Sequence, residues 1–399
     1  MDSGARVVAR LPTGIAGPPK LTTNSEVATM TYLRSKTALP IPKVLDWSDD
    51  PSNAIGAEYI IQEHVAGVQL HEAWPNMNSE QHMLCTKALS LALRKMAGLD
   101  FPVYGRDSLA GYCQGLIDTG FSRLPKIDTV DHDLLPHQGS VQDHIRLIKI
   151  SQEVLQRLIK DKRIQDAATP VLLHPDFHKR NIYVSDKDPT ITTGLIDCQS
   201  TSIEPAFIYA SEIPDFAAPP EGPDEHAFES IEDEQSEQTE QDKERERKDA
   251  SICYQTYDVC MKGLVPKLRS ARLLDPTLFR LFHYSHTTWR NSATAITQEL
   301  VELSARWEEL GLQGSCPYTP TKEELEKHAR NYEDFETVQR LKLWLRDFLN
   351  TNSDGWVPNE AWDASKEAHR AAYDEWIQTA RGEGMTVAKA DRLWPFDAR

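Results

Sequence analysis

Residues 172–199 constrain the fold more than any other part of the chain, because two short apolar runs there are bounded by polar side chains. The segment LLHPDFHKRNIYVSDKDPTITTGLIDCQ predicts two short strands joined by a turn at Asp186–Pro189. In an antiparallel pair of this length, Asn181 before one strand and Asp197 after the other lie at the same end. Asp176 lies on the loop that leads into this β-ribbon. The sequence therefore predicts three polar side chains gathered at one end of a hairpin.

The residue types in this group suit phosphoryl transfer. Carboxylate and amide oxygens are ligands that Mg²⁺ binds, and Asp197 and Asn181 supply one of each. Asp176 is placed to accept a hydrogen bond from a substrate hydroxyl and to orient it. The alternative interpretation is an ordinary hairpin with polar ends. The apolar strands on both sides and the third acid favour an active site that binds Mg²⁺.

Hydrophobic periodicity predicts the order of the elements. Strands are predicted over 4–12 and 56–70, a strand and turn over 41–50, and helices over 21–40, 80–98 and 141–163. Asn24 or Ser25 is the expected N-cap of the first helix, which places Glu26 in its first turn. From residue 250 onward the chain is predicted to be mainly helical. The pattern indicates an α+β fold of two lobes, a small α/β lobe followed by a larger helical lobe, with a cleft between them.

The net charge of −17 is concentrated in one segment. Residues 221–249 contain 13 acidic and four basic side chains, so the rest of the chain carries only about −8. Residues 217–249 are rich in Pro, Glu, Gln and Asp and poor in large apolar side chains. This composition predicts a disordered acidic insert.

Several classes of function are disfavoured by composition. An acidic chain without a Lys/Arg stripe does not suit nucleic-acid binding. No apolar run is long enough for a membrane span. The six cysteines form no C-x-x-C pair and have no zinc-site spacing, which favours reduced thiols in an intracellular protein.

HPDFHKRN and GLIDCQ resemble the catalytic and metal-binding segments of the aminoglycoside phosphotransferase family, the small-molecule branch of the protein-kinase-like fold. Protein kinases share the H-x-D-x-x-x-x-N frame, but most have Lys where this chain has His178. The stretches VARLPTGIAGPPKLTTNSEVATM and YIIQEHVAGVQL extend the resemblance to fungal members of the family that are associated with altered inheritance of mitochondria. The likeness covers residues 1–216 well and the helical remainder loosely.

The resemblance implies a role for each matching residue. Asp176 is the catalytic base, and Asn181 and Asp197 are the Mg²⁺ ligands. His174 braces the catalytic loop by hydrogen bonds, and His178 is a candidate for the substrate side.

The resemblance also implies an ATP site. Arg10 occupies the place of the phosphate-binding Lys of kinases, and Glu26 is the helix acid that pairs with it. Glu63 and Val65, with His64 between them, form the hinge whose backbone meets the adenine. An ordinary exit from a strand into a loop is the alternative for this hinge.

The implied domains are a partial nucleotide-binding lobe over 1–66, a core with the catalytic and metal segments over 67–216, the acidic insert over 217–249 and a helical remainder over 250–399. The acceptor pocket is expected in the last of these. No Gly-rich turn precedes the strand of Arg10, so we expect either a longer natural N-terminus or an incomplete lobe. In the usual G-D-P-x-x-D-L-A segment, this chain has Ile208 at the second Asp.

Three functions follow from these observations. The first is an ATP- and Mg²⁺-dependent phosphotransferase acting on a hydroxyl of an unknown small molecule or protein. The second is a kinase-like pseudoenzyme that binds a nucleotide or a partner without turnover. A structural mitochondrial assembly factor ranks last, because it leaves Asp176, Asn181 and Asp197 unexplained. The resemblance implies a mitochondrial location, with the cytoplasm as the alternative.

Overall fold

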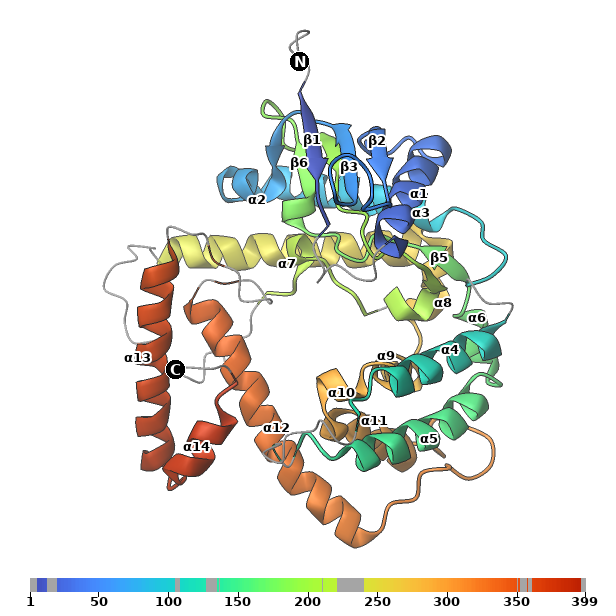
Figure 1. Ribbon diagram of the computed structural model, residues 1–399, viewed down its shortest axis with the longest axis vertical. Coiled ribbons are helices and arrows are strands. Elements are labelled where there is room, and N and C mark those ends of the chain that lie inside the picture. The colour runs from blue at the N-terminus through green and yellow to red at the C-terminus, as the bar shows by residue number, and fades with distance from the viewer. Residues whose placement is uncertain are drawn as a thin grey trace. The chain divides into compact units, whose positions relative to one another are not determined.

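The computed structural model describes residues 6–12, 20–104, 108–126, 135, 137–209, 211–220, 240–349, 351, 357 and 361–395 (Figure 1). The chain divides into two compact units. The first consists of Met1–Tyr112 and Lys162–Leu274, and the second of Cys113–Asp161 and Asp275–Arg399. These bounds differ from the domains expected from the sequence, since residues 250–274 belong with the segments that carry the site.

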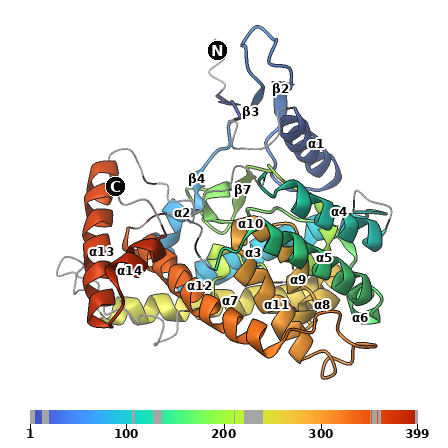
Figure 2. The same ribbon diagram turned by 60° about the horizontal axis from the view of Figure 1, so that its bottom comes forward.

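The first unit contains a three-stranded antiparallel sheet with α1 packed against it. Its strands β1 (Val7–Arg10), β2 (Val44–Ser48) and β3 (Tyr59–Glu63) are arranged in the order β1–β3–β2. Helix α1 (Leu21–Lys36) lies beside β2 and β3, as Figure 2 also shows. Its buried face includes Val27, Met30 and Leu33, which follow the spacing of one helical face. The predicted strands and helix are confirmed, with shorter bounds.

The expected cap of α1 is wrong. The helix begins at Leu21 rather than after Asn24 or Ser25, so Glu26 lies beyond its first turn. The carboxylate of Glu58 accepts hydrogen bonds from the Lys20 backbone N–H at 2.8 Å and the Thr23 hydroxyl at 2.7 Å. Glu58, from just before β3, therefore accepts the backbone N–H of the N-cap residue Lys20, which is the contact that the N3 side chain makes in a capping box.

The predicted β-ribbon is confirmed. Strands β6 (Ile182–Val184) and β7 (Thr192–Leu195) pair antiparallel, with Ile182 opposite Leu195, and β4 (Val68–Gln69) pairs with the other edge of β6. A further antiparallel pair consists of β5 (Pro170–Leu172) and β8 (Ile203–Pro205), which precede and follow the catalytic and metal-binding segments in the chain. Strand β8 is only three residues long and was not predicted from the sequence.

Short helices and two long ones complete the first unit. They are α2 (Leu70–Ala73), α3 (Ser79–Ala97), α6 (Lys162–Asp166), α7 (Glu240–Leu264) and α8 (Pro266–Arg272). A capping box between Asn78 and Gln81 begins α3. Helices α3 and α7 pack along each other, and buried Leu89 and Met261 are part of this core.

The bounds expected for the acidic insert, 217–249, need correction at both ends. Ala217 is buried, and residues 221–239 lie outside the described residues. From Glu240 on, the chain is helix α7. Near the start of α7, Asp249 is buried and its carboxylate lies 3.3 Å from His82 Nδ1 on α3. Residues 240–248 consist mainly of Glu, Gln, Lys and Arg, which favour a helix, and residues 244–248 are exposed, so local helix propensity accounts for this first part of α7.

The second unit is helical in its described residues. Its helices are α4 (Leu109–Ser122), which begins at the end of the first unit, α5 (Val141–Leu158), α9 (Arg280–Ser285), α10 (Thr288–Asn291), α11 (Ala293–Ala305), α12 (Lys322–Phe348), α13 (Trp362–Gly382) and α14 (Val387–Leu393). Helices α12, α13 and α14 share an apolar cluster that includes Leu341, Trp376 and Leu393. Within the described ranges, no helix is long and apolar enough to span a membrane.

Candidate active site

His174 holds the catalytic loop against the end of β7. It is buried, its Nε2 lies 2.8 Å from the Ile196 carbonyl oxygen, and its Nδ1 accepts the Asp176 backbone N–H at 3.2 Å. These contacts fix the neutral tautomer with the proton on Nε2. Burial lowers the pKa of His174, so the ring stays neutral at physiological pH. The expected bracing role agrees with these contacts.

The carboxylate of Asp176 is held from two sides. His178 Nε2 lies 2.9 Å from Oδ1, and Asn181 Nδ2 donates to Oδ2 at 3.0 Å and to the Asp176 carbonyl oxygen at 3.0 Å. The hydrogen bond from His178 is the largest cause that lowers the pKa of Asp176. The side chain is still half exposed, so an ionised oxygen remains accessible to a ligand.

His178 acts directly on Asp176, a role that the sequence had left open. Its Nδ1 accepts the Arg180 backbone N–H at 3.3 Å, which caps the short 3₁₀ turn Lys179–Asn181 and directs the Nε2 proton towards Asp176. The negative charge of Asp176 in turn raises the pKa of His178. The i, i+2 spacing is the signal that could have indicated this contact, and the His178 backbone N–H also donates to the Asp176 carbonyl oxygen at 3.0 Å.

The ribbon brings Asn181 and Asp197 to the same end, as predicted. The Ile196 backbone N–H donates to the Asn181 carbonyl oxygen at 3.0 Å, which places Asp197 one residue beyond that bond. The Asn181 side chain contacts Asp176 through Nδ2. No described residue donates to its Oδ1. Asp197 has a left-handed backbone, φ 62°, a conformation that Asp and Asn tolerate better than most residues.

The oxygen donors of Asn181 and Asp197 fit a nucleotide-bound Mg²⁺. No group of three or more His, Cys, Asp or Glu side chains that could hold a metal occurs among the residues described. Mg²⁺ in nucleotide sites commonly takes one or two protein ligands and completes its shell with phosphates and water. Asn181 Oδ1 and the second carboxylate oxygen of Asp197 are the atoms that would serve.

Arg10 connects the small sheet to the metal-binding segment. Its guanidinium pairs with Glu26 on α1, and its Nη2 lies 2.9 Å from Asp197 Oδ1. Glu26 is almost fully buried, and burial raises its pKa, an effect that the charge of Arg10 opposes. The predicted Arg10–Glu26 pair is present in the structure, and Asp197 is a second partner that sequence reasoning did not predict.

Glu63 and Val65 lie apart from this network. Glu63 Oε2 accepts the Lys43 backbone N–H at 3.0 Å and lies 3.7 Å from Arg34, so its side chain is directed to the β2 side of the sheet. Val65 packs against Gly194 on β7. A Cβ atom on residue 194 would lie 2.2 Å from Val65 Cγ1. The described part of the chain shows no hydrogen bond or ion pair from either residue to Arg10 or Asp176. Their adenine-binding role stays a prediction.

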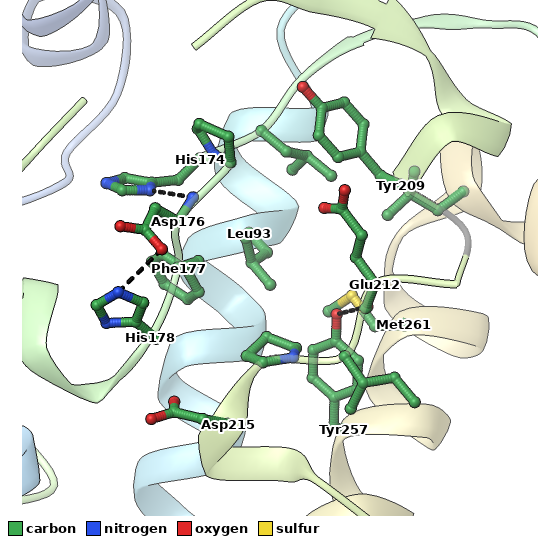
Figure 3. Close-up of a pocket in the computed structure, with 15 residues that line it drawn as sticks. Leu93, His174, Asp176, Phe177, His178, Tyr209, Glu212, Asp215, Tyr257 and Met261 are labelled. Atoms are coloured by element: carbon green, nitrogen blue, oxygen red, sulfur yellow. Dashed lines mark hydrogen bonds and ion pairs between the residues drawn. The ribbon is translucent and has the colours of Figure 1, made fainter. Parts of the chain in front are cut away.

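A pocket of about 280 Å³ opens beside Asp176 (Figure 3). Tyr257 and Met261 of α7 and Leu268 of α8 line it, from the region where the acceptor pocket was expected. Tyr209, Glu212 and Asp215 also line it, and the sequence analysis did not single them out. Asp215 Oδ1 accepts the Lys179 backbone N–H at 3.0 Å, which ties this wall to the catalytic loop.

The bridge made by Arg10 gives a stability prediction. Arg10→Met leaves the Glu26 carboxylate buried without its partner, so we expect a loss of about 3 kcal/mol in the free energy of unfolding, measured by urea denaturation. Arg10→Met combined with Glu26→Met should recover most of that loss. Lys162→Met, which removes an exposed pair with Asp166, serves as control and should cost less than about 1 kcal/mol. Strictly additive losses in the double variant would show that the two charges are not coupled.

The Asp176–His178 contact gives a pH prediction. NMR titration should place the pKa of His178 above its ordinary 6.5, and Asp176→Asn should lower it, because burial then acts without the carboxylate. His174 should titrate below 6.5 in both proteins. The folded pKa of His178 is raised, so its contribution to stability is complete below about pH 6.5 and is lost as pH rises through the folded pKa. An unchanged His178 titration in Asp176→Asn would contradict the contact.

Comparison with known proteins agrees with this geometry. The profile of the family described as "Phosphotransferase enzyme family" matches residues 2–208. The subtelomeric hrmA-associated cluster protein of Aspergillus fumigatus is 41% identical over 103 residues, a match that covers 26% of this chain and 20% of that protein. Altered inheritance of mitochondria protein 9, mitochondrial, of Candida tropicalis is 23% identical over 154 residues, covering 37% of this chain and 23% of that protein. The chain thus spans about a fifth of the length of the first curated relatives that it matches.

Two of the solved structures that resemble the chain are named as phosphotransferases. A putative aminoglycoside phosphotransferase from Ralstonia eutropha JMP134 has 14% identity and a TM-score of 0.43, with 84% of each chain covered. The gentamicin complex of APH(2″)-IIa has 13% identity and a TM-score of 0.41, with 74% of this chain and 85% of that chain covered. The expected α+β, kinase-like class therefore rests on the family match, which covers more than half of the chain: the chain belongs to the phosphotransferase enzyme family.

Proposed function

We propose that this chain is an ATP- and Mg²⁺-dependent phosphotransferase that phosphorylates a hydroxyl group. The observation that carries the proposal is the arrangement around Asp176. An ionised, half-exposed carboxylate faces a pocket, and Asn181 links it to the ribbon end that bears Asp197. Membership of the phosphotransferase enzyme family supports the reaction class.

Each residue has a definite task in this mechanism. Asp176 accepts a hydrogen bond from the acceptor hydroxyl, orients its oxygen for attack and is positioned to receive the proton. His178 holds that carboxylate in one orientation and keeps it ionised by donating from Nε2. Arg10 supplies positive charge next to Asp197, where phosphate oxygens are expected. Bound Mg²⁺, held by Asn181 and Asp197, would offset the negative charge of the transferring phosphoryl group.

The contact between Arg10 and Asp197 favours one alternative function, a kinase-like pseudoenzyme. Asp197 Oδ1 is already paired with a guanidinium, so a metal has to compete for this carboxylate or use its other oxygen. A kinase-like pseudoenzyme that binds nucleotide without turnover is compatible with that arrangement. The two functions differ in whether bound ATP is converted to ADP when an acceptor is present.

Nucleotide binding can be tested by thermal unfolding of the purified chain with and without Mg·ATP. At 100 times its dissociation constant a ligand stabilises by about 2.7 kcal/mol, a rise in midpoint of roughly 2 °C or more. We expect this rise in the wild type and a much smaller one in Asp197→Asn, which keeps the left-handed backbone at low cost but loses the charge. Asp186→Ala, at the opposite end of the ribbon, is the matched control and should respond like the wild type.

The same preparations separate the two functions. Asp176→Asn should retain Mg·ATP binding, since its side-chain oxygen can still accept the hydrogen bond from Asn181 Nδ2 and Asp176 has no contact with Arg10 or Asp197. A phosphotransferase forms ADP when hydroxyl compounds are supplied, and Asp176→Asn should lower that rate by at least about 100-fold. Binding without any ADP formation would favour the pseudoenzyme. Absence of a thermal shift in every protein would refute the nucleotide site in this chain.

We further propose a mitochondrial location, with the cytoplasm as the alternative. The support is the similarity to fungal proteins that are named mitochondrial, at 23% to 35% identity over short segments. Fractionation of fungal cells that express the tagged natural protein tests this location. Recovery with the cytosolic marker alone would overturn it.

A further inference from the structure

Lys179 lies between the two side chains that hold the Asp176 carboxylate. His178 precedes it, Asn181 follows it by two residues, and the 3₁₀ turn Lys179–Asn181 connects them. Because His178 and Asn181 contact Asp176 from the two ends of this turn, the orientation of the carboxylate depends on the position of the turn. Side chains that fix the turn are therefore candidates for positioning Asp176.

A segment outside the catalytic loop contacts this turn at two adjacent residues. The Gln69 side chain, at the end of β4, donates from Nε2 to the Arg180 carbonyl oxygen at 2.9 Å. The Lys179 ammonium nitrogen lies 5.2 Å from the centroid of the Trp74 ring, which is within the range of a cation–π contact. Trp74 directly follows α2. This segment therefore supports the turn through one hydrogen bond and through one aromatic face.

Trp74 is in turn fixed by contacts with α3 and α7. Its ring packs against that of His82, with ring centroids 4.4 Å apart. His82 Nε2 lies 3.0 Å from the Trp74 carbonyl oxygen, and His82 Nδ1 lies 3.3 Å from Asp249 Oδ2. His82 and Asp249 are both buried, where close packing leaves a side chain few alternative rotamers. Two helices of the same unit thus determine where the Trp74 ring lies.

Asp215 holds Lys179 from a second direction. Its Oδ1 accepts the Lys179 backbone N–H at 3.0 Å, and its Oδ2 lies 3.8 Å from the ammonium nitrogen. The Lys179 side chain is only 23% exposed, which strengthens its attraction to the carboxylate and to the aromatic face. The cation is therefore paired within the chain, which favours a supporting role over direct contact with a ligand.

We propose that Trp74 is a positioning residue for Asp176, acting through Lys179, and that His82 and Asp249 hold Trp74 in place. The role in catalysis rests on the proposed phosphotransferase function. No hydrogen bond or ion pair joins Trp74 to Asp176 in the ranges that the structure describes, so the effect of Trp74 passes through the turn. The metal-binding end keeps a separate support, because the Asn181 carbonyl oxygen accepts the Ile196 backbone N–H.

Two variants of Trp74 separate the aromatic contact from apolar volume. Trp74→Phe keeps an aromatic face, whereas Trp74→Leu keeps only apolar bulk. In the full chain labelled with [ε-¹³C]lysine, the ring current should shift the Lys179 ε-CH₂ protons upfield, with Lys179→Arg identifying the signal. We expect Trp74→Leu to remove this shift and Trp74→Phe to keep part of it. Trp362→Leu, at an exposed Trp of the second unit, is the control and should leave the signal unchanged.

The NMR titration of His178 reports whether the change reaches Asp176. Since the carboxylate raises the pKa of His178, a weaker contact should lower that pKa towards 6.5 in Trp74→Leu, and Trp74→Phe should stay closer to the wild type. His82→Phe keeps a ring beside Trp74 but removes both polar contacts, so it should move both signals in the same direction by a smaller amount. An unchanged Lys179 signal or an unchanged His178 titration in Trp74→Leu would overturn the inference.

A thermal unfolding transition establishes that each variant is folded. If Trp74→Leu does not fold, Lys179→Met removes the same contact from a side chain near the surface. Loss of the cation alone would raise the pKa of His178, so a lower His178 pKa in Lys179→Met can come only from a weaker contact with Asp176. A raised or unchanged His178 pKa in this variant would overturn the inference.

Kinetics test the consequence for catalysis. With a hydroxyl compound that the wild type phosphorylates, Trp74→Leu should lower kcat for ADP formation at least about tenfold and change KM for ATP less than about twofold. Trp74→Phe should recover most of the rate. Trp74→Leu combined with Lys179→Met should be no slower than the slower single variant, because both changes remove one contact.

Positioning and turnover fail separately in this design. The NMR measurements need no nucleotide, so a lost Lys179 shift together with a lowered His178 pKa supports the positioning of Asp176 even if the wild type forms no ADP. That result would count against the phosphotransferase function alone. Conversely, ADP formation at the wild-type rate in Trp74→Leu would overturn the positioning role and leave the phosphotransferase function intact.

Discussion

The position of Arg10 between two carboxylates is the interaction on which the candidate site depends. Glu26 is buried on α1, and a buried carboxylate needs a partner. The same guanidinium reaches Asp197, which belongs to a segment that follows 187 residues later in the chain. The small sheet, helix α1 and the metal-binding segment are therefore connected through one cation. A ligand that binds at Asp197 either competes with Arg10 for Oδ1 or uses the other carboxylate oxygen.

A second set of contacts fixes the catalytic loop independently of Arg10. His174 joins the loop to Ile196, and Asn181 joins it to the start of β6. Both bonds lead to the same end of the ribbon, so the loop is tied to both strands, β6 and β7. His178 then acts on an already positioned carboxylate, which explains how one imidazole can control both its orientation and its charge.

Local pattern was sufficient for the parts of the site that lie close together in the chain. Asp176, Asn181 and Asp197 were placed together because alternation and a turn signal define a hairpin, and the pairing of Ile182 with Leu195 agrees. The cap of α1 was wrong because the helix begins at Leu21, where Glu58 from a distant segment accepts the Lys20 backbone N–H. The start of α7 was wrong because the Glu, Gln, Lys and Arg side chains that indicate disorder also favour a helix.

The sequence by itself determined the ribbon, the three polar residues at its end and the resemblance to a phosphotransferase family, since all of these depend on short-range spacing. Only the tertiary structure decided that Arg10 pairs with Asp197 as well as Glu26, that His178 contacts Asp176, and that Tyr209, Glu212 and Tyr257 line one pocket. The physical reason is that charge pairing and pocket shape depend on distances between side chains from separate segments. Periodicity reports which face of an element is apolar, but it contains no information about which distant side chain that face will meet.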